Sequence, residues 1–263
     1  MRIPFADRAG GKMLSVHARF HAPEAREPGQ IITLAADEAA HLTRVLRLKA
    51  GASVRVFDGA GREFDAVVEA TSKRGTDIRV LTPRDAVPEP LLRVTLAQAV
   101  LKSDKMDDVV RDAVMMGVVA VQPLITSRSE VSPAVLERGR RRERWQRIAV
   151  ISAKQCGRAV VPDVLEPLTF TTLCAGRTAA ARDAALMLVE PAATSDAAAL
   201  ASLQRPSGSS VLIVVGPEGG WSPEEIRTAA DVLTLVTLRA PTLRADAMPV
   251  AALAALFSRW GEW

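Results

Sequence analysis

Residues 214–226, VVGPEGGWSPEEI, have the pattern of a strand, a glycine-rich loop and the first turn of a helix. Ser222 is placed to be the N-cap, Pro223 the first helical residue and Glu225 the partner in a capping box. The loop lacks both the GxGxxG spacing of dinucleotide-binding turns and the lysine of a P-loop, and Glu218 in its middle would repel a pyrophosphate. The stretch therefore predicts a site for a neutral or cationic ligand with a flat ring. The alternative is a tight turn that binds nothing.

Strands and helices alternate on both sides of this stretch, which is typical of a parallel α/β domain. The expected strands are residues 93–100, 118–124, 184–189, 210–215 and 233–238. The expected helices cover residues 104–116, a long segment that begins at Ser132-Pro133, and residues 246–260. Two further loops, at 188–191 and 238–246, leave strands as the glycine loop does. Three such loops at the carboxyl edge of one sheet would form a pocket.

The N-terminal third has a different pattern. Short strands are expected at residues 52–59, 63–69 and 77–81, with one helix at 37–46, which together indicate a small β-barrel. Residues 82–93, TPRDAVPEPLLR, contain three prolines and are typical of a linker. We therefore predict a barrel domain at 1–82, a linker at 83–93 and an α/β domain at 94–263.

Composition limits the possible functions. The 263 residues carry a formal net charge of +4, and a sequence pI of about 9.5 permits an anionic partner such as nucleic acid. The two cysteines have no metal-ligand spacing, and all three histidines precede residue 42, so we expect no metal site. No apolar run is long enough for a membrane span or for a signal peptide, so we expect a cytoplasmic protein without membrane contact.

Six segments, in the same order along the chain, resemble the bacterial 16S ribosomal RNA uridine N3-methyltransferases, the RsmE family of the knotted SPOUT superfamily. They are HLTRVLR at 41–47 with FDG at 57–59, KSDKMD at 102–107, SRSEV at 127–131, RWQRIA at 144–149, QCGR at 155–158 with VP at 161–162, and GPEGG at 216–220 with the later Leu-Arg at 243–244.

This resemblance implies a SPOUT domain with a deep trefoil knot, a PUA-like N-terminal barrel that binds RNA, and a homodimer. It implies S-adenosylmethionine as methyl donor and a uridine of 16S ribosomal RNA, or of the small ribosomal subunit, as target. The residues expected to hold the donor belong to the three strand-end loops: Leu188, Val189, Glu190, Gly216, Pro217, Glu218, Gly219, Gly220, Leu238, Ala240 and Leu243.

Two residues are candidates for the chemistry. Arg244 is expected to hydrogen-bond a uracil oxygen and stabilise the anion formed when N3 loses its proton, and Asp246 to orient Arg244 or to accept that proton. Their alternative roles are a salt bridge for Arg244 and the N-cap of the last helix for Asp246. The residues expected to contact RNA phosphates are Lys102, Lys105, Arg128, Arg142 and Arg158; the alternative for the basic run at 138–144 is a solvated helix face.

The last loop departs from the family pattern LGxRxLRxET. Arg239 stands in place of the glycine, Pro241 in place of the first arginine, Asp246 in place of the glutamate and Ala247 in place of the threonine. These changes leave open a lapsed methyltransferase that survives as an RNA-binding or ribosome-assembly protein. A dinucleotide-dependent reductase is disfavoured by the composition of the glycine loop.

Overall fold

The computed structural model describes residues 18–72, 75–138, 140–176, 182–238 and 241–262. The chain divides into two compact units. One contains residues up to 58 together with 62–85, and the other contains residues 59–61 together with 86 onward. Within the described residues, no helix is both long enough and apolar enough to span a membrane.

The first unit is built on a five-stranded sheet of order β1-β3-β4-β5-β2. Its strands are β1 (Arg19–His21), β2 (Ile31–Thr33), β3 (Ser53–Phe57), β4 (Glu63–Ser72) and β5 (Gly75–Arg84). Strands β3, β4 and β5 form an antiparallel meander, in which alternate residues of β4 and β5 are buried over part of their length. The expected helix is the short α1 (Ala36–Ala40), followed by a π-helical turn, η1 (His41–Val45), whose Leu42 is buried in the core.

The second unit contains an eight-stranded sheet of order β11-β13-β10-β12-β6-β7-β8, in which β9 also pairs with β7. All of these pairs are parallel, which confirms the predicted α/β class. The strands are β6 (Arg93–Ala99), β7 (Ala120–Ile125), β8 (Asp163–Val164), β9 (Leu168–Thr169), β10 (Ala184–Leu188), β11 (Ala198–Ala199), β12 (Ser210–Val215) and β13 (Thr234–Thr237).

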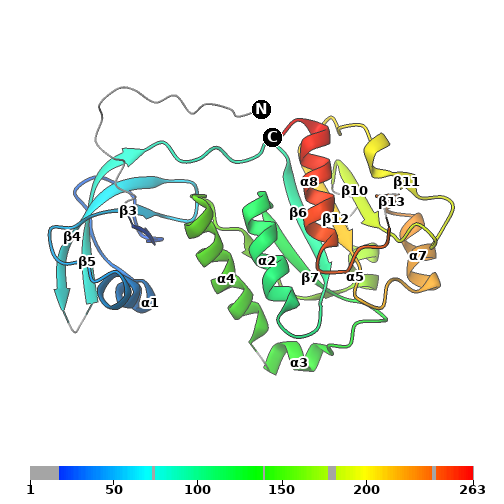
Figure 1. The fold of residues 1–263 in the computed structure, drawn as a ribbon, viewed down its shortest axis with the longest axis horizontal. Coiled ribbons are helices and arrows are strands. Elements are labelled where there is room, and N and C mark those ends of the chain that lie inside the picture. The colour runs from blue at the N-terminus through cyan, green and yellow to red at the C-terminus, as the bar shows by residue number, and fades with distance from the viewer. Residues whose placement is uncertain (1–17, 73–74, 139, 177–181, 239–240, 263) are drawn as a thin grey trace, which may run out of the picture. The chain divides into compact units, whose positions relative to one another are not determined.

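Helices cover this sheet in two groups (Figure 1). Helix α2 (Lys105–Met116) packs against both α4 (Arg141–Cys156) and α8 (Met248–Trp260), and α5 (Phe170–Ala175) packs against α7 (Pro223–Ala230). Leu212 and Val214 of β12 share a core cluster with residues of α5 and α7. Their fully buried neighbours Val211 and Ile213 point to the opposite face, because side chains alternate along a strand. The continuous apolar run of β12 is thus explained by burial on both faces.

Local sequence signals fix several helix ends. Helix α2 buries Met106, Val109 and Ala113 on one face and ends at Gly117, whose φ of +100° favours glycine. A Cβ at Gly117 would also lie 2.7 Å from Cγ of Pro90. Helix α7 begins with the predicted capping box of Ser222 and Glu225, which the structure confirms.

Two predicted helices differ from those observed. The single long helix expected after Ser132 is wrong, because α3 (Pro133–Arg138) and α4 are separate and Arg140 between them has a φ of +44°. The sequence has Gly139 between the two helices, and glycine has a low helix propensity. The last helix begins at Met248 with Ala247 as N-cap, so Asp246 does not occupy the N-cap position.

Candidate functional site

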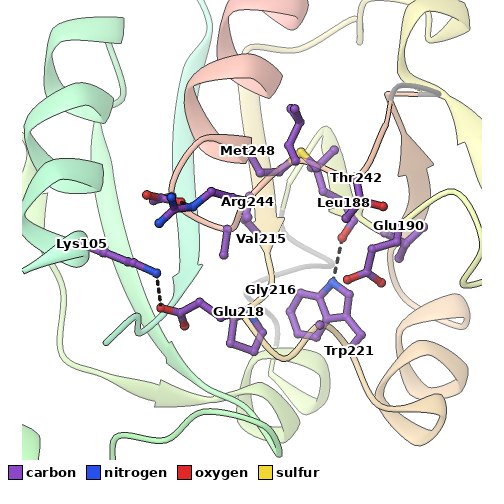
Figure 2. A pocket seen from close by; sticks show the side chains of 16 residues that line it. Lys105, Leu188, Glu190, Val215, Gly216, Glu218, Trp221, Thr242, Arg244 and Met248 are labelled. Atoms are coloured by element: carbon purple, nitrogen blue, oxygen red, sulfur yellow. Dashed lines mark hydrogen bonds and ion pairs between the residues drawn. The ribbon is translucent and has the colours of Figure 1, made fainter. Parts of the chain in front are cut away.

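The three predicted strand-end loops line one cavity of about 380 Å³, here called the strand-end cavity (Figure 2). Strands β13, β10 and β12 are neighbours in the sheet, and the loops follow their carboxyl ends at Thr237, Leu188 and Val215. This is the edge at which open parallel sheets bind ligands. The volume lies within the range of small-molecule sites.

The cavity brings together most of the residues predicted to hold a ligand. The predicted residues that line it are Leu188, Val189, Glu190, Gly216, Pro217, Glu218, Gly220, Leu243, Arg244 and Asp246. Leu238 lines a smaller cavity that shares Leu243 with the strand-end cavity. Gly219 faces Arg128, because a Cβ at Gly219 would lie 3.2 Å from that side chain. Ala240, like Arg239, lies outside the described residues.

Trp221 forms one wall of the strand-end cavity. Its side chain is only 4% exposed, its Nε1 donates a 2.7 Å hydrogen bond to the carbonyl of Leu188, and its ring packs on Phe170 at 5.0 Å between centroids. A Cβ at Gly216 would lie 2.9 Å from the indole. The first glycine of the loop is therefore needed to admit Trp221, whether or not a ligand is bound.

Glu218 is held by the segment that begins α2. Its carboxylate accepts hydrogen bonds from the backbone N–H of Lys102 (3.2 Å) and from Nζ of Lys105 (3.3 Å). Burial raises the pKa of Glu218, but these bonds and one from its own backbone outweigh that effect, so the net pKa is lowered. Glu218 is therefore ionised at neutral pH, and Lys105, which also lines the cavity, partly compensates its charge.

Arg244 and Asp246 lie together at the cavity, as Nε of Arg244 is 3.3 Å from Oδ1 of Asp246. The Arg244 side chain is 73% exposed, so this ion pair contributes little to stability. Figure 2 shows Arg244 and Lys105 on the same side of the cavity, with Trp221 and Glu190 on the other side. Arg244 thus presents an exposed guanidinium at the cavity.

The basic residues predicted to contact RNA have different environments. Arg128 is exposed and donates from Nη1 to the carbonyl of Gly219 (2.8 Å). Arg142 is also exposed, although its Nε donates to Val164 O and its guanidinium pairs with Glu166. Lys102 pairs through Nζ with Glu130.

Arg158 differs from the other predicted RNA contacts because it is only 6% exposed. Its guanidinium pairs with Glu89 and donates a 2.6 Å hydrogen bond to Val114 O. Arg158 thus links the segment before β6 to α2. Because its guanidinium is buried in these contacts, Arg158 is not among the proposed RNA contacts.

Sequence reasoning missed several cavity residues. Val215, Thr242, Ala245 and Met248 line it but were not predicted, and Lys105 was assigned to RNA alone. Each of the first four lies within two residues of a predicted loop position, so adjacency to the loops could have identified them. Within the part of the chain that the structure describes, no three His, Cys, Asp or Glu side chains are grouped to hold a metal ion.

Comparisons with known proteins agree with this geometry. Residues 87–257 match the family model of an RNA methyltransferase domain, and residues 34–81 match that of an RNA methyltransferase PUA domain. Ribosomal RNA small subunit methyltransferase E of Synechocystis is 30% identical, with 97% of this chain and 81% of the relative aligned.

Two solved structures have the same fold over almost the whole chain. One is ribosomal RNA small subunit methyltransferase E of Neisseria gonorrhoeae bound to S-adenosyl methionine, with 30% identity, a TM-score of 0.82, and coverage of 93% of this chain and 98% of that one. The other is a Legionella pneumophila protein described as a methyltransferase with bound cofactor SAM, with 27% identity, a TM-score of 0.84, and coverage of 92% and 97%. The chain belongs to the RNA methyltransferase family of ribosomal RNA small subunit methyltransferase E.

Proposed function

We propose that this protein transfers a methyl group from S-adenosylmethionine to N3 of a uridine in 16S ribosomal RNA. The observation that carries the proposal is the strand-end cavity, which three loops form at the carboxyl ends of the neighbouring strands β13, β10 and β12. Two structural neighbours, with TM-scores of 0.84 and 0.82, are described as bound to the same donor. The curated relatives are named for methylation of small-subunit ribosomal RNA.

The chemistry of the cavity fits this donor. Glu190, Glu218 and Asp246 bring carboxylates to its lining, which favours a ligand with a sulfonium and an ammonium group over a phosphorylated one. Within the described residues, the Glu190 carboxylate makes no hydrogen bond or ion pair, and the buried Oδ1 of Asp246 accepts no hydrogen bond. The Glu190 carboxylate therefore has acceptor capacity left for a ligand, whereas Oδ1 of Asp246 faces Nε of Arg244. Val215, Leu243 and the wall formed by Trp221 offer apolar surface for an adenine ring.

The donor supplies an activated methyl group, and the residues of the chain prepare the acceptor. Uridine N3 must lose its proton before it can act as a nucleophile. Arg244, with an exposed guanidinium at the cavity, donates hydrogen bonds to a uracil oxygen and stabilises the charge that develops there. Asp246 pairs with Nε of Arg244 and so orients the guanidinium without blocking its outer nitrogens.

The proposal extends to the architecture of the family. We propose that the strand-end loops are part of a deep trefoil knot in an S-adenosylmethionine-binding domain at residues 94–263. A linker at 83–93 joins this domain to a PUA-like barrel at 1–82 that binds RNA, and the protein acts as a homodimer in the cytoplasm. The PUA family match supports an RNA-binding role for the first unit. In the second unit, exposed cations are supplied by Arg128 beside the glycine loop and by Arg142 beside Val164.

The decisive test is methylation of 16S ribosomal RNA from cells that lack the gene. We expect purified protein and S-adenosylmethionine to restore one methyluridine, detected by mass spectrometry of nuclease fragments. Calorimetry with S-adenosylmethionine alone tests the donor site independently. Absence of donor binding at millimolar concentration, with RNA binding retained, would reject the enzyme in favour of a lapsed RNA-binding protein.

A further inference from the structure

Glu225 makes more contacts than a capping box requires. A capping box needs one acceptor oxygen for the N-cap N–H, and Oε2 of Glu225 fulfils this role at 2.9 Å from the N–H of Ser222. The same carboxylate accepts a 2.8 Å bond from the backbone N–H of Ser127 on Oε1 and a 2.8 Å bond from the Ser127 hydroxyl on Oε2. Ser127 lies 98 residues earlier in the chain, so Glu225 joins two distant segments.

The carboxylate is ionised despite its burial. Glu225 is 8% exposed, and burial alone raises its pKa, but hydrogen bonds from Ser127 and Ser222 lower it to a net value below the usual range. Hydrogen bonds to an ionised acceptor are stronger than neutral ones. The two hydrogen bonds from Ser127 to the Glu225 carboxylate are therefore stronger than hydrogen bonds between neutral groups.

The segment held by Glu225 carries one of the exposed arginines. Residues 126–130, here called the Ser127 segment, form a compact turn in which the N–H of Thr126 donates to Oγ of Ser129 at 3.1 Å. Arg128, the residue next to Ser127, donates to the carbonyl of Gly219 at the tip of the glycine loop. The Ser127 segment is thus attached to the glycine loop and its helix at two points, Glu225 and Gly219.

The glycine loop is also a wall of the strand-end cavity. Gly216, Pro217, Glu218 and Gly220 line the cavity on one side of the loop, and Arg128 contacts Gly219 on the other. A ligand in the cavity and a ligand on Arg128 would therefore each restrict the remaining motion of the same linked pair of segments. When two ligands restrict the same motion, the second to bind loses less conformational entropy.

We propose that Glu225 is a positioning residue that couples RNA binding at the Ser127 segment to donor binding in the strand-end cavity. This inference rests on the proposed function. The ionised carboxylate fixes Ser127, and with it Arg128, against the glycine loop. Each ligand then increases the affinity of the other by the same factor, because binding linkage is reciprocal. We expect a factor of about 10, within the common range for coupled sites.

Glu225→Gln separates the coupling role from the capping role. Glutamine is itself a capping-box residue, so its oxygen still accepts the Ser222 N–H and the helix stays capped. Its NH₂ group then faces the Ser127 N–H, donor to donor, and this contact is lost. Glu224→Gln is the matched control, because Glu224 is exposed in the same helical turn.

The experiment measures binding without turnover. The affinity of the full-length protein for S-adenosylhomocysteine is measured by calorimetry with and without saturating 16S ribosomal RNA, and RNA affinity is measured separately by filter binding. In the wild-type and Glu224→Gln proteins, RNA should tighten binding about tenfold. In Glu225→Gln, this factor should fall below about 2, and RNA affinity without donor should fall severalfold. Ser127→Ala, which keeps the backbone bond, should give an intermediate factor.

The possible outcomes separate the inference from the proposed function. A tenfold factor retained in Glu225→Gln, or lost equally in Glu224→Gln, overturns the inference, as does a wild-type protein that binds both ligands without coupling. A wild-type protein that binds no donor overturns the proposed function and the inference with it. If Glu225→Gln does not fold, the inference is overturned instead by Ser127→Ala, should RNA tighten S-adenosylhomocysteine binding to that variant as much as to the wild type.

Discussion

Replacing Trp221 by phenylalanine would remove one hydrogen bond and part of one wall from the strand-end cavity. The indole donates to the carbonyl of Leu188 at 2.7 Å and packs on Phe170, and it joins the loop after β12 to the end of β10. Phenylalanine keeps an aromatic ring at this position but has no N–H donor. The substitution therefore loosens the connection between two of the three loops.

The size of the effect follows from burial. Leaving the buried Leu188 carbonyl without a partner costs about 1–3 kcal/mol. The void left by the smaller ring adds about 1 kcal/mol. A total of about 3 kcal/mol lowers Tm by roughly 6–12 °C in a domain of this size. Because Trp221 lines the cavity, we also expect donor affinity to fall about tenfold, which corresponds to about 1.4 kcal/mol.

Trp260→Phe is the matched control. Trp260 is 5% exposed and its Nε1 donates to Leu203 O, but it is not among the residues that line the strand-end cavity. Its bond is longer, at 3.4 Å, so a similar or smaller loss of Tm is expected, with donor affinity unchanged. Thermal unfolding followed by circular dichroism and calorimetry with donor measure the two quantities. The reasoning is refuted if Trp221→Phe leaves both within error of wild type, or if Trp260→Phe weakens donor binding equally.

Three further outcomes are expected. Arg244→Ala should lower kcat by about 10²–10³-fold in a methyl-transfer assay, whereas Arg259→Ala, at an exposed position of α8, should not; equal losses would exclude the proposed role. Iodoacetamide at pH 8 should modify the exposed Cys156 but not native Cys174, as peptide mass spectrometry would show, because burial and then the charge of Glu225 raise the pKa of Cys174 to about 11. The folded state holds the Cys174 proton more tightly than the unfolded state does. The free energy of unfolding should therefore fall as pH rises from about 8.5 to about 11. Gly117→Ala should lower Tm by several degrees in thermal unfolding, because its φ of +100° and a 2.7 Å contact both oppose a Cβ; an unchanged Tm would contradict this.

Local spacing was enough to predict much of the second unit. The alternation of apolar strands and amphipathic helices predicted the parallel sheet, and the order Ser222, Pro223, Glu225 predicted the capping box. The helix expected at 104–116 ends at Gly117, a glycine C-cap that is a local signal of the same kind. These features depend on residues within a few positions of one another, so the sequence by itself determines them.

Other features depend on which charges meet across the fold. Arg128 and Arg158 both lie within segments that resemble the family, and the sequence alone could not tell which of them is exposed. The structure leaves Arg128 exposed and buries Arg158 against Glu89, 69 residues away. The break between α3 and α4 at Arg140 was not predicted, because the Ser132-Pro133 signal marks where a helix begins and not where it ends.

The sequence by itself determined the glycine loop, the charge of Glu218 within it and its carboxyl-end position, and these features disfavour a phosphate ligand. Only the tertiary structure decided what the loop contacts. The order β13-β10-β12 brings together loops that are far apart in the chain and places Trp221 against Leu188. The continuation of the sheet through β6 to β7 brings Ser127, which follows β7, to Glu225. Strand order is set by the packing of the whole domain, and no local pattern of residues encodes it.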